Sequence, residues 1–170
     1  EGGAGWAGDG CVASEPGGPL GVVMGDCLPG RRHDPAAGVM GAVHGGWRGS
    51  VADILGAAVA QMCAIGGHPA DIRAAIGPGT GACCFEVGPD VVAAAQALLH
   101  EPLGALVRPR ADGKALLDLK GVNARRLVQL GVPAGQIAVS DACTLCPPDV
   151  FRSPPATAAR RGVPAAVTPL

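Results

Sequence analysis

Aromatic and charged residues are both scarce in this chain of 170 residues. It contains no tyrosine, two tryptophans and two phenylalanines, and 13 lysines and arginines balance 14 aspartates and glutamates. The formal net charge of −1 leaves no basic stripe with interleaved aromatics, which excludes a typical nucleic-acid-binding protein. Alanine, valine and leucine have to form the core, because 48% of the residues are hydrophobic and only four of those are aromatic.

Long apolar runs are missing as well. No stretch reaches the ~18 consecutive apolar residues of a transmembrane helix, and no signal peptide is recognisable. The seven cysteines are an odd number, which is atypical of a small secreted disulfide framework. We therefore expect reduced thiols and a cytoplasmic protein with no membrane partner. The chain begins with Glu1, and we interpret residues 1–170 as a single domain that lacks its N-terminal portion.

Glycine and proline are abundant instead, with 28 and 16 residues, and they separate short apolar segments. Helical spacing predicts helices at 89–99 and 122–130. The polar residues of 29–35 indicate a turn, and 153–164 is typical of a loop. The apolar segments predict strands at 10–13, 20–24, 39–44, 71–76, 115–119, 136–139 and 165–167. The alternation favours an α/β or α+β sandwich, with mixed β-sheets flanked by helices.

The most regular helical pattern follows Ser50. Asp53 stands three residues later, as in a capping box, and glycines at 66–67 would end the helix. We therefore expect a helix over 51–64. Its buried face should carry Ile54, Leu55, Ala58 and Met62, with Asp53 and Gln61 exposed.

Two predicted strand ends carry the residues with the clearest chemistry. Strand 39–44 ends at His44, and Cys27 follows the strand 20–24. A cysteine and a histidine at neighbouring strand ends make half a zinc site or a nucleophile–base pair. An antiparallel pairing of these two strands would hold Cys27 and His44 apart, unless the first strand bends after Cys27.

Arg48 and the glycine turn beside His44 suggest an anion clamp. Arginine offers a planar fork of donors, and Gly45 and Gly46 let the backbone approach a ligand. A helix from Ser50 would also direct its N-terminus towards the site. Asp26 either caps a turn, or protonates a purine nitrogen or orients a ligand.

Four further cysteines lie in two pairs. Adjacent residues on a strand point to opposite sides, so at most one of Cys83 and Cys84 is expected to line a site. Cys143 and Cys146 have the spacing of a metal or redox pair. A structural zinc ion would need a second pair of matching spacing, which the chain lacks, so we expect a structural loop there. The three histidines other than His44 are expected to be solvated: His33, His68 and His100.

Five motifs follow one another in a fixed order: GDCLP (25–29), AVHGGWRG (42–49), AAIGPGTGACCFEVG (74–88), LDLKGVNARRLVQLGV (117–132) and SDACTLC (140–146). Together they resemble the YfiH/laccase-domain family, whose members have been labelled polyphenol oxidases, purine nucleoside phosphorylases and peptidoglycan-editing factors. The resemblance covers roughly residues 10–152. It implies an α/β sandwich with mixed sheets, consistent with the pattern above.

The resemblance also implies a metal site of histidine, cysteine and histidine. The family cysteine matches Cys27 and the second histidine matches His44, whereas the first histidine, from a VHG-like motif, has no counterpart before Gly25. Zinc is the expected metal. Copper is less expected, because multicopper oxidation needs many histidines and this chain has four. Two ligands would hold zinc weakly, so we expect weak zinc binding and poor activity until an upstream histidine is supplied.

The function implied by the resemblance is an enzyme of purine nucleosides and phosphate. It would carry out phosphorolysis of adenosine, inosine and guanosine, release adenine from methylthioadenosine, and deaminate adenosine. Its catalytic residues would be Asp26, Cys27, His44 and Arg48, with Gly45, Gly46 and Arg48 binding substrate. Two alternatives stay open: a Cys–His hydrolase of a peptidoglycan precursor, and a catalytically impaired metal-binding scaffold.

Overall fold

The computed structural model describes residues 8–15, 20–146 and 165–168. Its strands are β1 (Gly10–Ala13), β2 (Leu20–Val23), β3 (Leu28–Asp34), β4 (Val39–Gly45), β5 (Arg73–Ile76), β6 (Glu86–Val87), β7 (Val107–Pro109), β8 (Ala115–Leu117), β9 (Ile137–Val139) and β10 (Ala165–Thr168). Its helices are α1 (Trp47–Val51), α2 (Ile54–Ala64), α3 (Pro89–Leu99) and α4 (Leu119–Gln129). The predicted loop at 153–164 lies outside the described residues.

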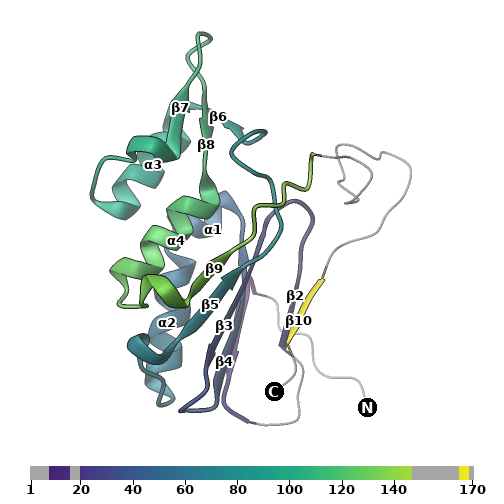
Figure 1. The fold of residues 1–170 in the computed structure, drawn as a ribbon, viewed down its shortest axis with the longest axis vertical. Coiled ribbons are helices and arrows are strands. Elements are labelled where there is room, and N and C mark those ends of the chain that lie inside the picture. Colours follow the sequence, from purple (N-terminus) through teal and green to yellow (C-terminus); the bar gives the residue numbers. More distant parts are fainter. Residues whose placement is uncertain (1–7, 16–19, 147–164, 169–170) are drawn as a thin grey trace.

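A five-stranded sheet of order β1-β4-β3-β5-β9 forms the centre of the fold (Figure 1). Its strands are antiparallel except for β5 and β9, which run parallel. Helices α2 and α4 cover one face, and the β2–β10 ribbon lies on the other side (Figure 1). The three-stranded sheet β6-β8-β7 packs with α3 at one end. This arrangement confirms the expected α+β sandwich with mixed sheets.

Two apolar clusters hold these layers together. The larger lies between the central sheet and α2, where Val43 and Met62 are fully buried, and the smaller joins α3 to β8 and α4, where Leu117 and Val122 are fully buried. Trp47 packs against both clusters. Phe85 also packs against both clusters. Two of the four aromatic residues of the chain therefore connect the two clusters. No helix in the described part of the chain is long and apolar enough to cross a membrane.

The predicted turn at 29–35 is wrong, because this segment is the central strand β3. Residues facing the helices are buried and alternate with exposed ones, as in any strand with one covered face. Two of the buried residues are Arg32 and Asp34. Because both are polar, the alternation of buried and exposed positions that marks a strand is not visible in the sequence. The Asp34 carboxylate accepts hydrogen bonds from the backbone N–H groups of Ala36, Ala37 and His68, which explains its burial.

The predicted helix at 51–64 is divided in the structure. Ser50 is not its cap: it lies buried in α1, and its hydroxyl accepts a hydrogen bond from Asn123 Nδ2 at 3.0 Å. The chain turns at Asp53, which has the left-handed φ of 59° and caps α2 by accepting from Gly56 N at 3.1 Å. Of the expected helix faces, Leu55, Ala58 and Met62 are buried and Gln61 is exposed, whereas Ile54 and Asp53 are half-buried.

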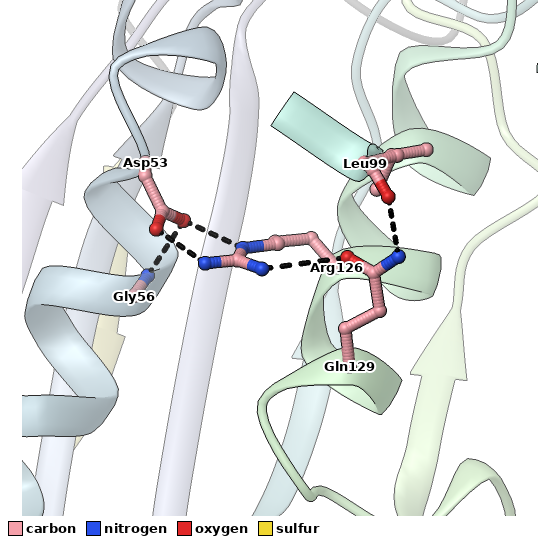
Figure 2. A network of polar contacts seen from close by, with 5 residues as sticks. All are labelled: Asp53, Gly56, Leu99, Arg126 and Gln129. Atoms are coloured by element: carbon pink, nitrogen blue, oxygen red, sulfur yellow. Dashed lines mark hydrogen bonds and ion pairs between the residues drawn. The ribbon is translucent and has the colours of Figure 1, made fainter. Parts of the chain in front are cut away.

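Asp53 also anchors α4 (Figure 2). Arg126 donates from Nε to Oδ1 at 2.9 Å and from Nη2 to Oδ2 at 2.6 Å. Arg126 Nη1 also donates to Gln129 Oε1 at 3.4 Å, and Gln129 Nε2 donates to the carbonyl of Leu99 at the end of α3. The hydrogen bonds from Arg126, together with that from Gly56, outweigh partial burial and lower the pKa of Asp53. One small network therefore connects three helices.

Replacing Asp53 with alanine should destabilise the fold by about 2–3 kcal/mol. Loss of an N-cap costs ~0.5–2 kcal/mol, and alanine tolerates a left-handed φ poorly, at ~1–2 kcal/mol. Asp53→Asn keeps the cap and the left-handed φ and loses only the charge, so it should cost about 1 kcal/mol or less. Urea unfolding at neutral pH measures both values. Equal losses in the two variants would show that the ion pair, and not the cap, carries the stability.

The lowered pKa also predicts a pH dependence. Because the folded-state pKa of Asp53 lies below its unfolded value, its stabilisation is complete above the unfolded pKa of ~3.9. That stabilisation disappears as the pH falls through the folded-state value. The difference in stability between the wild type and Asp53→Asn should therefore shrink as the pH drops below ~4.

Candidate metal centre

Cys27 and His44 are brought together by the pairing of β3 with β4. In this antiparallel register, Leu28 faces Gly45 and Pro29 faces His44. Cys27, which directly precedes β3, is therefore placed beside Gly46, which directly follows β4. A pairing of strands 20–24 and 39–44 would have held the two residues apart, but β4 pairs instead with β3, the strand that follows Cys27.

The two candidate ligand atoms, Cys27 Sγ and His44 Nε2, both lie beside Gly46. A Cβ atom at Gly46 would lie 3.3 Å from Cys27 Sγ and 3.6 Å from His44 Nε2. These atoms therefore lie within about 7 Å of each other, and an ion ~2.3 Å from sulfur and ~2.0 Å from nitrogen would hold them no more than ~4.3 Å apart. His44 Nε2 is buried and has no hydrogen-bond partner among the described residues. A glycine at 46 keeps this space open, and the unpartnered nitrogen suits a metal.

Asp9 orients the imidazole and was missed by the sequence analysis. Its Oδ1 lies 3.0 Å from His44 Nδ1, and its carbonyl accepts from the backbone N–H of His44 at 2.7 Å. With the proton on Nδ1, Nε2 carries the lone pair, as in the carboxylate–histidine pairs that support metal ions. Asp9 lies in a glycine-rich stretch 35 residues before His44, and only the β1–β4 pairing reveals its position.

The surroundings of Cys27 disfavour an unassisted thiolate. Burial raises the pKa of the Cys27 thiol, and the negative charges of Asp26 and Asp9 raise it further. A cysteine nucleophile normally has a lowered pKa beside a cation or a helix N-terminus. The half-buried thiol and its acidic neighbours therefore suit a bound cation better than a Cys–His nucleophile pair.

Asp26 is held in place by the loop after β5. Its backbone carbonyl accepts from Thr80 N at 2.9 Å and from Thr80 Oγ1 at 3.2 Å. The residue is half-buried, and its charge acts on the neighbouring Cys27. The structure thus places Asp26 at the same site as Cys27 and His44.

Arg48 is exposed at the rim of this site. Its guanidinium lies over the Trp47 ring, 4.5 Å from the centroid, a cation–π contact that holds the side chain at the surface. The expected contribution of a helix dipole from Ser50 is wrong: α1 has five residues, and α2 begins at Ile54 with Asp53 as its cap. Arg48 is the charged candidate for anion binding at this turn.

A second set of candidate ligands includes neither Cys27 nor His44. The sulfur atoms of Cys83, Cys84, Cys143 and Cys146 all lie within 4.8 Å of one another, and could hold a metal ion. Residues 82–84 form a turn and not a strand, so both adjacent cysteines contribute. The expectation that Cys143 and Cys146 lack a second pair is therefore wrong. In the described part of the chain, no other group of three or more His, Cys, Asp or Glu ligands is gathered this closely.

The four thiols differ in acidity. Burial opposes ionisation of Cys143, but hydrogen bonds from the backbone N–H groups of Gly81 and Leu145 outweigh it and lower its pKa to about 7. The pKa of Cys84 is raised, first by its hydrogen bond with Cys146 and then by burial. Among the thiols of this cluster with a shifted pKa, Cys143 is the one whose pKa is lowered.

Glu86, within the motif at 74–88, forms surface ion pairs with Lys114 at 2.6 Å and Arg110 at 3.2 Å. The three other histidines are exposed, as expected, although His33 lies in β3 and not in a turn. Laccase chemistry needs several histidines around several coppers, and among the described residues His44 is the one histidine in a site-like setting.

The sequence of this chain is similar to known proteins of one family. The family described as multi-copper polyphenol oxidoreductase laccase matches residues 3–168. Adenosine deaminase RL5, from an unknown prokaryotic organism, is 41% identical over 127 residues, which are 75% of this chain and 48% of that protein. A purine nucleoside phosphorylase of Deinococcus radiodurans is 42% identical over 139 residues, which are 82% of this chain and 53% of that protein.

The fold has a close counterpart among solved structures. The crystal structure of YlmD from Geobacillus stearothermophilus matches with a TM-score of 0.85 at 34% sequence identity. The match covers 94% of this chain and 59% of the YlmD chain. The chain thus spans about half the length of the curated relatives it matches.

Proposed function

Because this chain belongs to the family of multi-copper polyphenol oxidoreductase laccases, which the five ordered motifs indicated, we propose that it contributes the Cys27–His44 centre of an enzyme that acts on purine nucleosides. The proposed reactions are phosphorolysis of adenosine, inosine and guanosine, release of adenine from methylthioadenosine, and deamination of adenosine. Relatives named purine nucleoside phosphorylase and adenosine deaminase support this substrate class. We place the enzyme in the cytoplasm.

The observation that carries the proposal is the buried Nε2 of His44, which has no hydrogen-bond partner among the described residues and lies, like the thiol of Cys27, beside Gly46. Cys27 and His44 are the residues that would hold the metal, and Asp9 would hold the imidazole in the required tautomer. A thiolate and an imidazole are ligands that zinc prefers. When bound, zinc would act as a Lewis acid and lower the pKa of a coordinated water molecule.

Other side chains would bind the substrates. Arg48 would bind phosphate through its fork of donors, beside the backbone of Gly45 and Gly46. The carboxyl group of Asp26 would protonate a purine nitrogen as the base departs. The exposure of Arg48 and the partial burial of Asp26 beside Cys27 support this division of roles.

The proposal is tested by incubating the purified protein with adenosine, with and without phosphate. We expect phosphate-dependent release of adenine with ribose 1-phosphate, and phosphate-independent formation of inosine, both at the low rate of a centre whose zinc is held by two protein ligands. Arg48→Ala should raise the KM for phosphate about 10-fold or more, since a hydrogen bond to a charged group contributes ~1.5–3 kcal/mol. Deamination of adenosine needs no phosphate and should change little in this variant.

Arg73→Ala is the matched control, because Arg73 is an exposed arginine on β5. An equal change in KM in both variants would contradict the assignment of Arg48. If neither reaction occurs in zinc-loaded protein, the purine nucleoside proposal fails. Oxidation of a polyphenol by copper-loaded protein would favour the laccase reaction in its place.

A further inference from the structure

We propose that Cys83, Cys84, Cys143 and Cys146 bind one zinc ion, forming a structural site separate from the Cys27–His44 centre. The four residues come from two segments 62 positions apart: the turn after β5 and the segment after β9. Those strands lie side by side in the central sheet, so the segments that leave them meet at the same end of the sheet. A bound ion would fasten these two segments to each other.

The sulfur positions approach those of a tetrahedral tetrathiolate site. With zinc–sulfur bonds of ~2.3 Å, the edges of such a tetrahedron are ~3.8 Å. The four sulfur atoms lie within 4.8 Å of one another, and the Cys84–Cys146 pair is at 3.0 Å. Small side-chain rotations therefore suffice to admit an ion. Four thiolates favour zinc over harder cations, and closed sets of four protein ligands are typical of structural zinc.

The backbone around the cluster is already arranged to support thiolates. Gly81 N donates to Cys143 Sγ at 3.2 Å. A Cβ atom at Gly81 would lie 3.1 Å from the Cβ of Cys143 and 3.4 Å from Cys83 Sγ, so a larger residue would crowd the two segments apart. Thr144 N donates to the carbonyl of Gly79 at 3.2 Å. These hydrogen bonds hold the two segments together without the ion. Less order has to be gained on binding, which lowers the entropy cost of binding the ion.

A buried lysine provides the balancing charge. Lys120 Nζ donates to the carbonyls of Ser140 at 2.8 Å and Ala142 at 2.7 Å, directly before Cys143. Zinc with four thiolates has a net charge of about −2, and the ammonium group offsets part of it. Lys120 is 5% exposed, and a charge so buried is normally paired.

The site would also stabilise the neighbouring centre. The loop that carries Cys83 and Cys84 begins at Gly77, and its Thr80 donates twice to the carbonyl of Asp26, next to Cys27. Zinc at the four cysteines would fix this loop and with it the position of Asp26. Its role is structural, so it does not depend on the purine nucleoside reactions proposed above.

The test uses the Cys27→Ala protein, in which the other centre has lost a ligand. We expect zinc near one equivalent per chain by elemental mass spectrometry. Replacing zinc by Co²⁺ should give the intense visible and thiolate charge-transfer absorption of a tetrahedral four-thiolate site. Adding Cys143→Ser should weaken zinc binding by at least about 10–100-fold, as losses of even supporting residues do. Cys63→Ser is the matched control, because Cys63 is an exposed cysteine outside the cluster.

If Cys143→Ser fails to fold by circular dichroism, Cys146→Ser at the exposed edge of the cluster replaces it. Zinc retained by both serine variants would overturn the proposal, as would Cys27→Ala protein without zinc. A Cys84–Cys146 disulfide in the purified protein, seen by mass spectrometry without reductant, would also overturn it. Loss of the cobalt–thiolate absorption in the serine variants, with Cys63→Ser unchanged, would support it. None of these outcomes depends on adenosine turnover.

Discussion

Replacing His44 with alanine should remove zinc from the Cys27 centre and lower the rate of adenosine phosphorolysis by at least about 10²-fold, because a catalytic metal contributes several kcal/mol of transition-state stabilisation. The physical reason is the position of Nε2: it is buried, has no hydrogen-bond partner in the described part of the chain, and lies within about 7 Å of Cys27 Sγ. Kinetics with adenosine and zinc analysis of the same sample measure the two effects. The zinc bound by the four-cysteine cluster should remain.

Asp9→Asn should weaken zinc binding at the same centre without removing a metal ligand. The amide keeps the size of the carboxylate but removes the charge that supports the Nδ1 proton, so zinc affinity at this centre should fall by ~10–100-fold. His33→Ala is the matched control, since His33 is an exposed histidine of the same sheet. Unchanged zinc content and turnover in His44→Ala would remove His44 from the site. An effect in His33→Ala of equal size would mean that the loss is not specific.

Replacing Arg32 with leucine should stabilise the protein by up to about 4 kcal/mol, the upper end of the range found when buried ion pairs are exchanged for well-packed apolar side chains. Arg32 is 2% exposed on the helix-covered face of β3, and its Nε and Nη1 have no hydrogen-bond partner among the described residues. Burial lowers its pKa to about 10. Its neighbours across the sheet are Gly41 and Ala74, so a branched apolar side chain has room there.

Thermal and urea unfolding test this expectation. For a domain of this size the melting temperature should rise by ~2–4 °C per kcal/mol. Arg73→Leu is the control, because it makes the same exchange at an exposed position of the adjacent strand and should change stability by less than about 0.5 kcal/mol. A loss of stability in Arg32→Leu would show that the guanidinium is satisfied in the folded protein.

The regular elements were predictable from the sequence because their patterns are local. The expected helices at 89–99 and 122–130 correspond to α3 and α4, and the expected strand at 39–44 corresponds to β4. Apolar spacing encodes such elements within a few residues. The break at Asp53 was not predictable this way, because the pairing with Arg126 that accompanies it comes from 73 residues away.

The sequence by itself determined the family, the sandwich fold and the identity of Cys27 and His44 as the residues of interest. Only the tertiary structure decided how they meet, because the polar residues Arg32 and Asp34 concealed β3, whose pairing brings Cys27 to Gly46. The same holds for Asp9 and for the four cysteines. Each depends on contacts between segments far apart in the chain, and such contacts follow from strand order and turn geometry, which no local pattern encodes.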